Sequence, residues 1–123
     1  MTTQEIFDKV VRHLITQGVK SKESKGLNSI CMYRADRTPE CPCRCAVGSL
    51  IEDSEYSEWM EGCVLAELYD SSECPDSLKA RVEPHLELLS YLQKIHDDQP
   101  VEKWVPLLKD LANQFGLIMP EMT

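Results

Sequence analysis

Apolar residues recur at three- and four-residue steps near both ends of this chain, which is the spacing of a helix that buries one face. The N-terminal stripe consists of Ile6, Val10, Val11, Leu14 and Ile15. Thr2 and Glu5 have the spacing of a capping box in front of it, and Gly18 is placed to end it. The pattern predicts a helix over residues 3–17.

A longer stripe follows Pro75 and comprises Leu78, Val82, Leu86, Leu89, Leu92 and Ile95. Pro84 lies within it, and proline lacks the N–H that a helix interior needs, so we expect a kink or a later start there. The last stripe follows Pro100, stops at Gly116 and comprises Trp104, Leu107, Leu108, Leu111 and Phe115. Both stripes predict helices with one buried face.

The region before these stripes is less regular. Residues 29–34 and 44–47 have strand character, and they could pair as a small hairpin across a proline-containing turn. Residues 48–51 could instead belong to a buried helix that begins near Cys43, because periodicity does not decide so short an apolar run.

The fold expected from these patterns is one compact helical domain that spans residues 1–123, a common size for a single core. Short helices over 57–60 and 64–69 would add to the long ones. The fold class is therefore mainly α, or α+β if a β-hairpin forms around residues 29–47.

The formal net charge of −8 is unevenly distributed along the chain, because residues 1–45 carry +3 and residues 79–123 carry −2. Residues 46–78, the acidic segment, contain no Lys or Arg and nine carboxylates: Glu52, Asp53, Glu55, Glu58, Glu61, Glu67, Asp70, Glu73 and Asp76. Affinity for nucleic acid comes mainly from Lys and Arg, so we expect no direct nucleic-acid binding. The acidic segment suits a partner protein with a basic surface, or else serves only as a solvated face.

Six cysteines indicate a disulfide scaffold only in a secreted chain. The sequence shows neither a signal peptide nor a membrane-spanning stretch, so we expect a cytoplasmic protein with reduced thiols and no membrane contact. Four thiols could complete a tetrahedral zinc shell, namely Cys31, Cys41, Cys43 and Cys45. Their one-residue gaps differ from the usual two-residue zinc knuckle, and free or partly buried thiols are the alternative.

We expect no enzymatic activity, because the usual catalytic motifs are missing from the sequence. His13, His85 and His96 do not have zinc-protease spacing, and no phosphate-binding glycine loop or nucleophile elbow occurs. His96 is placed to interact with the dipole at a helix C-terminus. Glu52 and Asp53 are neighbours, and neighbouring side chains do not face each other on a helix or strand.

Two sequence motifs begin at Cys31 and Cys45, the first and last of the four cysteines named above as possible zinc ligands. They are Cys31-Met32-Tyr33-Arg34 and Cys45-Ala46-Val47-Gly48-Ser49-Leu50-Ile51-Glu52-Asp53, followed by Tyr56 and Met60-Glu61-Gly62. Further segments of the pattern are Leu92-Gln93-Lys94-Ile95-His96-Asp97 and Phe115-Gly116-Leu117. In these segments the chain resembles small uncharacterised bacteriophage and prophage proteins, and the resemblance extends over most of the chain. The resemblance implies phage or prophage origin and the cytoplasm of a host cell, with no established activity and no catalytic residues.

The leading hypothesis is a non-enzymatic phage accessory protein that binds a host protein and inhibits or redirects it. Its candidate contact residues place aromatic side chains among carboxylates, and they are Glu52, Asp53, Glu55, Tyr56, Glu58, Trp59 and Glu61. The aromatic residues could instead pack on the core. The alternative hypothesis is a zinc-binding or thiol-dependent module organised by the four cysteines. The sequence leaves homo-oligomerisation open.

Overall fold

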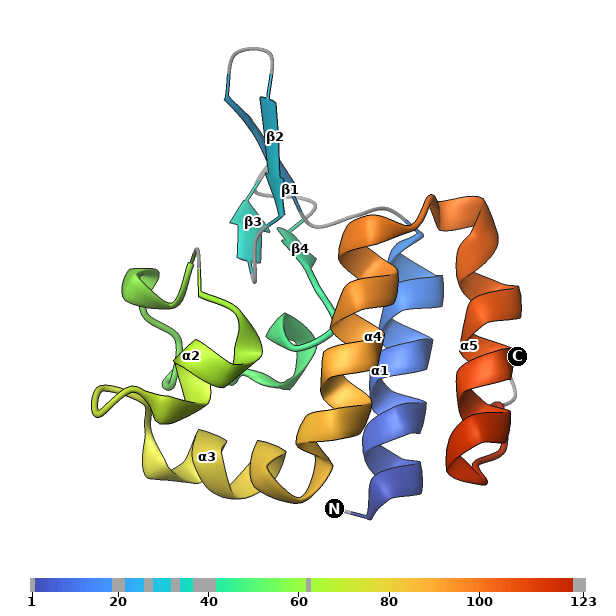
Figure 1. Cartoon of the computed structure of the whole chain (residues 1–123). Coiled ribbons are helices and arrows are strands. Elements are labelled where there is room, and N and C mark those ends of the chain that lie inside the picture. Colours follow the sequence, from blue (N-terminus) through green and yellow to red (C-terminus); the bar gives the residue numbers. More distant parts are fainter. Residues whose placement is uncertain are drawn as a thin grey trace.

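The computed structural model describes residues 2–18, 45–61 and 63–120, together with the backbone of short strands between residues 22 and 44. It is mainly helical, as the sequence predicts (Figure 1). The α-helices are α1 (Thr3–Gln17), α2 (Leu65–Asp70), α3 (Asp76–Val82), α4 (Leu86–Asp98) and α5 (Trp104–Phe115). Short 3₁₀ helices connect them, and these are η1 (Gly48–Leu50), η2 (Glu58–Met60), η3 (Glu83–His85) and η4 (Val101–Lys103).

Helix α1 begins and ends where its sequence signals lie. The Thr2 hydroxyl accepts a hydrogen bond from the Glu5 amide at 3.1 Å, and the Thr2 amide donates to the Glu5 carboxylate at 2.9 Å. Gly18 follows the helix with φ of 67°, a left-handed conformation that residues with a Cβ rarely adopt. The predicted capping box and glycine stop are therefore confirmed.

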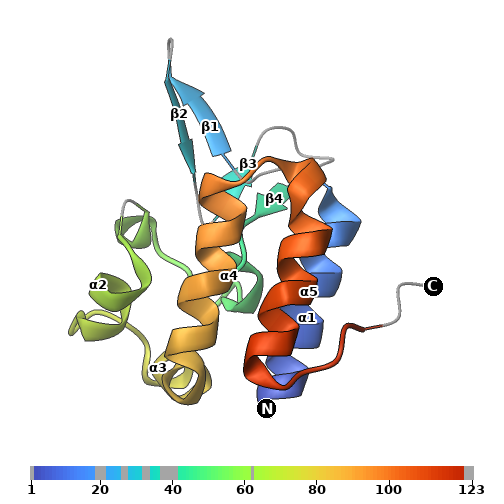
Figure 2. The same ribbon diagram turned by 45° about the vertical axis from the view of Figure 1, so that its right-hand side comes forward.

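Helices α1, α4 and α5 lie side by side and form a three-helix bundle (Figures 1 and 2). Its fully or almost fully buried side chains include Phe7, Val10, Leu14, Leu89, Leu92, Trp104 and Leu108. The side-chain amide of Gln4 holds the segment after α5, because it donates to the Ile118 carbonyl at 2.7 Å and accepts from the Ile118 amide at 3.0 Å. Within the described residues, none of the helices is both long enough and apolar enough to cross a membrane.

Pro84 divides the long C-terminal stripe into two helices. Helix α3 ends at Val82, Pro84 lies in η3, and α4 begins at Leu86. A proline cannot donate to the hydrogen-bond ladder of a continuous helix, and this explains the break. The turn between α3 and α4 contacts the bundle, because Nδ1 of the buried His85 lies 3.2 Å from the Thr3 hydroxyl of α1.

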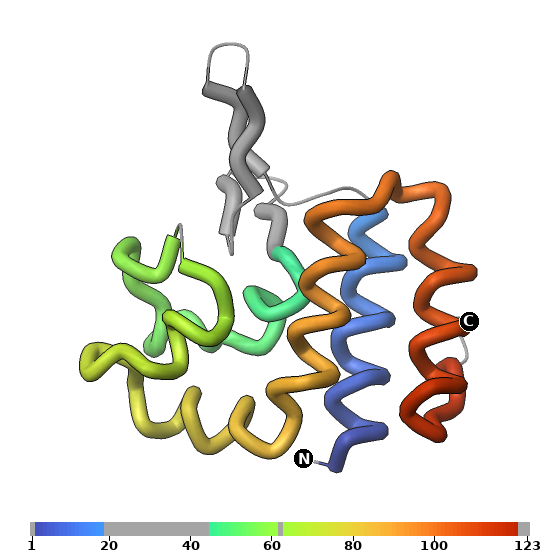
Figure 3. The backbone as a smooth tube through the Cα atoms, in the orientation of Figure 1, coloured from blue at the N-terminus to red at the C-terminus, as the bar shows by residue number. Residues whose placement is uncertain are grey.

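The acidic segment lies on the side of α4 that is opposite to α5 (Figures 1 and 2). Figure 3 follows the chain from residue 45 beside α4, outward to α2 and back into α3. Buried apolar side chains anchor this path to the helices, and they are Leu50, Ile51, Met60, Leu65, Leu68 and Leu78. The segment is therefore part of the same packed domain, although its outer face is strongly charged.

The strands are β1 (Lys22–Lys25), β2 (Asn28–Cys31), β3 (Arg34–Asp36) and β4 (Pro42–Arg44). β1 pairs with β2 and β3 pairs with β4, both antiparallel. The hairpin expected between residues 29–34 and 44–47 is not supported, because β2 pairs with β1 and not with β4, and Ala46 and Val47 form a turn. Both pairs join strands that follow each other in the chain, and the short loops between such strands cost little chain entropy.

We predict that Leu92→Ala destabilises the protein by about 2–5 kcal/mol, because it leaves a cavity where α4 packs in the bundle. Leu92 is fully buried. Chemical denaturation at neutral pH measures the change in the free energy of unfolding. Glu87→Ala, at an exposed position of the same helix, is the control and should change it by less than about 0.5 kcal/mol. Equal effects of the two substitutions would contradict the assignment of Leu92 to the core.

Candidate functional site

Glu55 is an acidic residue whose carboxylate lies inside the protein. It follows η1 in the acidic segment and is only 6% exposed. Its Oε1 accepts a hydrogen bond from Arg81 Nη1 at 2.7 Å, and its Oε2 accepts one from Arg81 Nη2 at 3.1 Å. Oε1 also accepts from the Glu52 amide at 2.9 Å, and the Ser77 hydroxyl donates to Oε2. Both oxygens of the buried carboxylate are therefore satisfied.

Helix α3 supplies the side chains that bind Glu55. Ser77 and Arg81 are four residues apart on this helix, so they project from the same face. Arg81 Nη1 also donates to the Leu50 carbonyl at 2.9 Å, and its Nη2 lies 3.6 Å from Glu52 Oε1. We name this set, Leu50, Glu52, Glu55, Ser77 and Arg81, the arginine clamp. It fixes the start of the acidic segment to α3.

The arginine clamp keeps Glu55 ionised despite its burial. Burial alone would raise the pKa of Glu55, but the hydrogen bonds from Arg81, Ser77 and the Glu52 amide outweigh it and lower the pKa to about 2. Glu55 was predicted to be a partner-binding residue. Its carboxylate is instead enclosed and already bonded on both oxygens, so it is not part of an exposed contact surface.

Carboxylates remain on the outer face of the acidic segment. Glu52, Asp53 and Glu58 are exposed, and the side chain of Glu52 is 67% exposed although it lies near Arg81. Glu58 starts the short helix η2, three residues after the buried Glu55. The arginine clamp binds the loop on both sides of Asp53, through Leu50 and Glu52 and through Glu55, so Glu52 and Asp53 lie on a stretch of backbone that is held from inside.

Two aromatic residues lie between these carboxylates and the core. The Tyr56 hydroxyl donates to Glu61 Oε2 at 2.6 Å, and both residues are half-buried. Trp59 is also half-buried and packs against the core, and its carbonyl accepts a weak hydrogen bond from the Cys63 thiol at 3.6 Å. Each aromatic side chain therefore packs on the core with one part and leaves another part accessible, and its role as a partner contact stays a prediction.

The zinc site predicted from Cys31, Cys41, Cys43 and Cys45 stays a prediction. Cys41 and the side chains of Cys31 and Cys43 lie outside the described residues. Cys45 is 1% exposed, its sulfur accepts a hydrogen bond from the Gly48 amide at 3.3 Å, and burial raises the pKa of its thiol far above the ordinary value. Among the described residues, no group of three or more His, Cys, Asp or Glu side chains is arranged to hold a metal ion.

A partly buried polar network connects the acidic segment to α4. The Val47 amide donates to Gln93 Oε1 at 3.0 Å, and Gln93 Nε2 donates to Asp97 Oδ1 at 2.8 Å. His96 Nδ1 lies 2.7 Å from the same Asp97 oxygen, and its ring is 5.6 Å from that of Trp104. The sequence predicted for His96 only a position at the helix end. Its full burial follows from packing against the first turn of α5, which the pattern of α4 does not reveal.

Arg81 and Gln93 organise the acidic segment but were not predicted from the sequence. A signal for Arg81 was present, because Lys79 and Arg81 are the first cations after a long segment that has none. No comparable signal marks Gln93, because a polar residue in a helix is ordinarily solvated.

No protein-family model, curated protein or solved structure matches this chain. The function is therefore argued from the charge and geometry of the residues described above.

We predict that the Glu55 carboxylate makes folding pH-dependent. Because its pKa is about 2 in the folded protein and higher in the unfolded chain, its stabilising contribution is present above about pH 4.5 and is lost as the pH falls toward 2. The contribution at pH 7 is on the order of 3 kcal/mol. Urea denaturation between pH 7 and pH 2 should therefore show a steeper loss of stability in the wild type than in Glu55→Gln.

We predict that loss of the Arg81 guanidinium lowers the free energy of unfolding at neutral pH by at least as much as loss of the Glu55 charge. Arg81→Met leaves a buried carboxylate without its cation, and we expect a loss of about 3–5 kcal/mol in the free energy of unfolding. Glu58→Gln is the matched control at an exposed carboxylate and should cost less than about 0.5 kcal/mol. A loss of similar size in both variants would show that the internal position of Glu55 is wrongly assigned.

We also predict that Cys45 resists alkylation in the folded protein, because its thiol is buried and its pKa is raised. Iodoacetamide labelling followed by peptide mass spectrometry measures the rate at each cysteine, before and after unfolding in urea. Cys45 should react only after unfolding. Rapid labelling of Cys45 in the native protein would contradict the buried position and would favour an exposed thiol.

Proposed function

We propose that this protein is a non-enzymatic accessory protein of phage or prophage origin, which binds a host protein with a basic surface and modulates it. The contact surface is formed by the exposed carboxylates Glu52, Asp53 and Glu58, together with the accessible parts of Tyr56 and Trp59. We name these five residues the acidic surface. The origin rests on the sequence resemblance, and the mode of binding rests on the geometry described above.

The observation that carries the proposal is that the arginine clamp fixes the loop of the acidic surface from within. Arg81 binds the Glu55 carboxylate and the Leu50 carbonyl, so its charge is largely used inside the protein. The exposed carboxylates of this loop are therefore presented in a defined arrangement, and less ordering entropy is lost when a partner binds.

Charge and aromatic residues have separate roles in such a contact. Several carboxylates on one face attract a basic partner and accelerate its association, and this effect weakens as salt is added. A half-buried tryptophan supplies apolar contact area at little cost in side-chain entropy, and tryptophan is enriched at the energetic centres of interfaces. Trp59 lies one residue after Glu58, which places both contributions in the same patch.

The experiment compares two charge-reversal variants of the full tagged chain. Glu52→Lys with Glu58→Lys changes the acidic surface, and Glu87→Lys with Glu102→Lys changes exposed residues of α4 and η4. Each pair raises the formal net charge from −8 to −4, since each substitution adds two charges. Both variants are applied to bacterial extract at low and high salt, and the captured proteins are identified by native mass spectrometry.

We expect the wild type and the control variant to retain a stoichiometric basic protein at low salt, and the acidic-surface variant to lose it. Thermal melting checks that each variant is folded. If the reversal at Glu52 disturbs Arg81, Glu52→Gln with Glu58→Gln tests the same surface with less strain. Equal capture by the acidic-surface and control variants would refute the proposal, and the acidic segment would then be a solvated face.

A further inference from the structure

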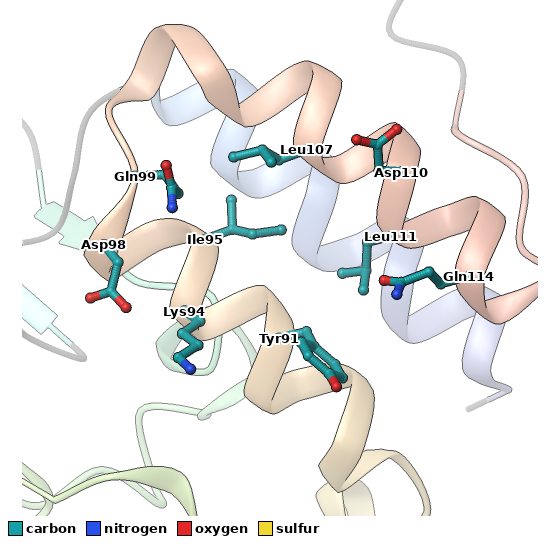
Figure 4. Close-up of a pocket in the computed structure, with 9 residues that line it drawn as sticks. All are labelled: Tyr91, Lys94, Ile95, Asp98, Gln99, Leu107, Asp110, Leu111 and Gln114. Carbon is teal, nitrogen blue, oxygen red and sulfur yellow. The ribbon is translucent and has the colours of Figure 1, made fainter.

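A groove of about 450 Å³ lies between α4 and α5, but it offers a partner little to bind (Figure 4). Its floor residues Ile95 and Leu111 are only 9% and 3% exposed. On the α4 rim, Lys94 and Asp98 carry opposite charges that offset each other. Neither the floor nor the charge of this groove selects a partner, whereas a single residue of the acidic segment does.

Val64 is an exposed apolar residue within the acidic segment. Among the described residues, four large apolar side chains are exposed, and Val64, at 63%, is the only one of these four that lies between residues 46 and 78. It occupies the N-cap of α2, with an extended backbone (φ −75°, ψ 164°). Its carbonyl accepts the Leu68 amide at 3.0 Å, so the helix starts directly after it.

Valine is an unfavourable residue at this position. Ser, Thr, Asp and Asn are preferred at an N-cap, because their side-chain oxygen binds a free amide of the first turn. Valine has no such oxygen, and no side-chain hydrogen bond caps α2. The other half of a capping box is present, because the Val64 amide donates to Glu67 Oε1 at 3.0 Å. A residue that breaks a local folding rule without a structural gain is typical of a functional position.

The surroundings of Val64 are acidic and partly aromatic. The hydrogen bond to its amide places the exposed Glu67 beside it. On the other side, Cys63 turns the chain back to η2, because its amide donates to the Met60 carbonyl at 3.2 Å and its thiol donates to the Trp59 carbonyl at 3.6 Å. Val64 therefore follows a turn that returns to the helix that carries Trp59, and it extends the acidic surface by an apolar point.

We propose that Val64 is the apolar anchor of the contact made by the acidic surface, and that the partner is a basic protein segment with a large apolar side chain among its cations. This inference rests on the proposed function. The cations face Glu58 and Glu67, and the apolar side chain covers Val64. A second copy of this chain and a nucleic acid both carry the wrong charge for this surface.

The carboxylates and Val64 contribute differently to recognition. Carboxylates attract basic proteins with little distinction among them, and added salt weakens that attraction. Contact between apolar side chains is short-ranged and does not depend on charge, so salt does not screen it. Val64 therefore selects those basic segments that also carry an apolar side chain, and this preference should persist at high salt.

Calorimetric titration of the full chain with two synthetic peptides tests the inference. One peptide has leucines spaced among lysines, and the other has the same lysines with serine in place of every leucine. The wild type should bind the leucine peptide at least about fivefold more tightly than the serine peptide. In Val64→Ser this preference should fall below about twofold, at low and at high salt alike.

Two variants serve as matched controls. Val105→Ser makes the same chemical change at a residue of α5 that is 40% exposed and lies outside the acidic segment, and it should keep the full preference. Val64→Ile retains an apolar side chain and should also keep it. Because Val64→Ser completes the capping box, its melting temperature should equal or exceed that of the wild type, which separates loss of the contact from loss of folding.

Three results would overturn the inference. A leucine preference that is equal in Val64→Ser and the wild type would place the apolar contact elsewhere. A melting temperature of Val64→Ser clearly below that of the wild type would show that the valine serves folding. Failure of the wild type to bind either peptide would remove both this inference and the proposed contact.

The variant Glu52→Gln with Glu58→Gln tests the proposed function separately. It should bind both peptides more weakly at low salt and keep the leucine preference, because it changes charge and leaves Val64 in place. Unchanged binding of both peptides by this variant, together with a preference that still depends on Val64, would refute the acidic surface and retain Val64 as an apolar contact.

Discussion

The partly buried guanidinium of Arg81 ties the acidic segment to α3, in addition to the apolar side chains that the segment buries. Nine carboxylates within residues 46–78 repel one another, and no Lys or Arg in that segment offsets them. Arg81 reaches back from α3 to bind the most deeply placed carboxylate, that of Glu55, and the Leu50 carbonyl at the same time. This contact neutralises the buried carboxylate on the inner side of the loop, next to buried apolar residues such as Leu50. The charge that remains is directed outward.

The long helices could be predicted from sequence because their determinants are local. The Thr2 capping box, the glycine after α1 and the proline between α3 and α4 each act within one or two turns of the chain. The arginine clamp could not be predicted in this way, because Glu55 and Arg81 are 26 positions apart and Glu55 resembles its exposed neighbours in sequence. The prediction of which strands pair was wrong for a related reason. The choice between β1 and β4 as the partner of β2 depends on loop closure, which side-chain patterns do not encode.

The placement of the two tryptophans makes each part of the domain observable by itself. Trp104 is buried in the three-helix bundle beside His96, with the rings 5.6 Å apart, whereas Trp59 is half-buried in the acidic segment. The emission of Trp104 therefore reports on a dry environment next to an imidazole, and that of Trp59 reports on a surface open to water. In single-tryptophan versions of the chain, fluorescence would distinguish loosening of the charged loops from melting of the helices.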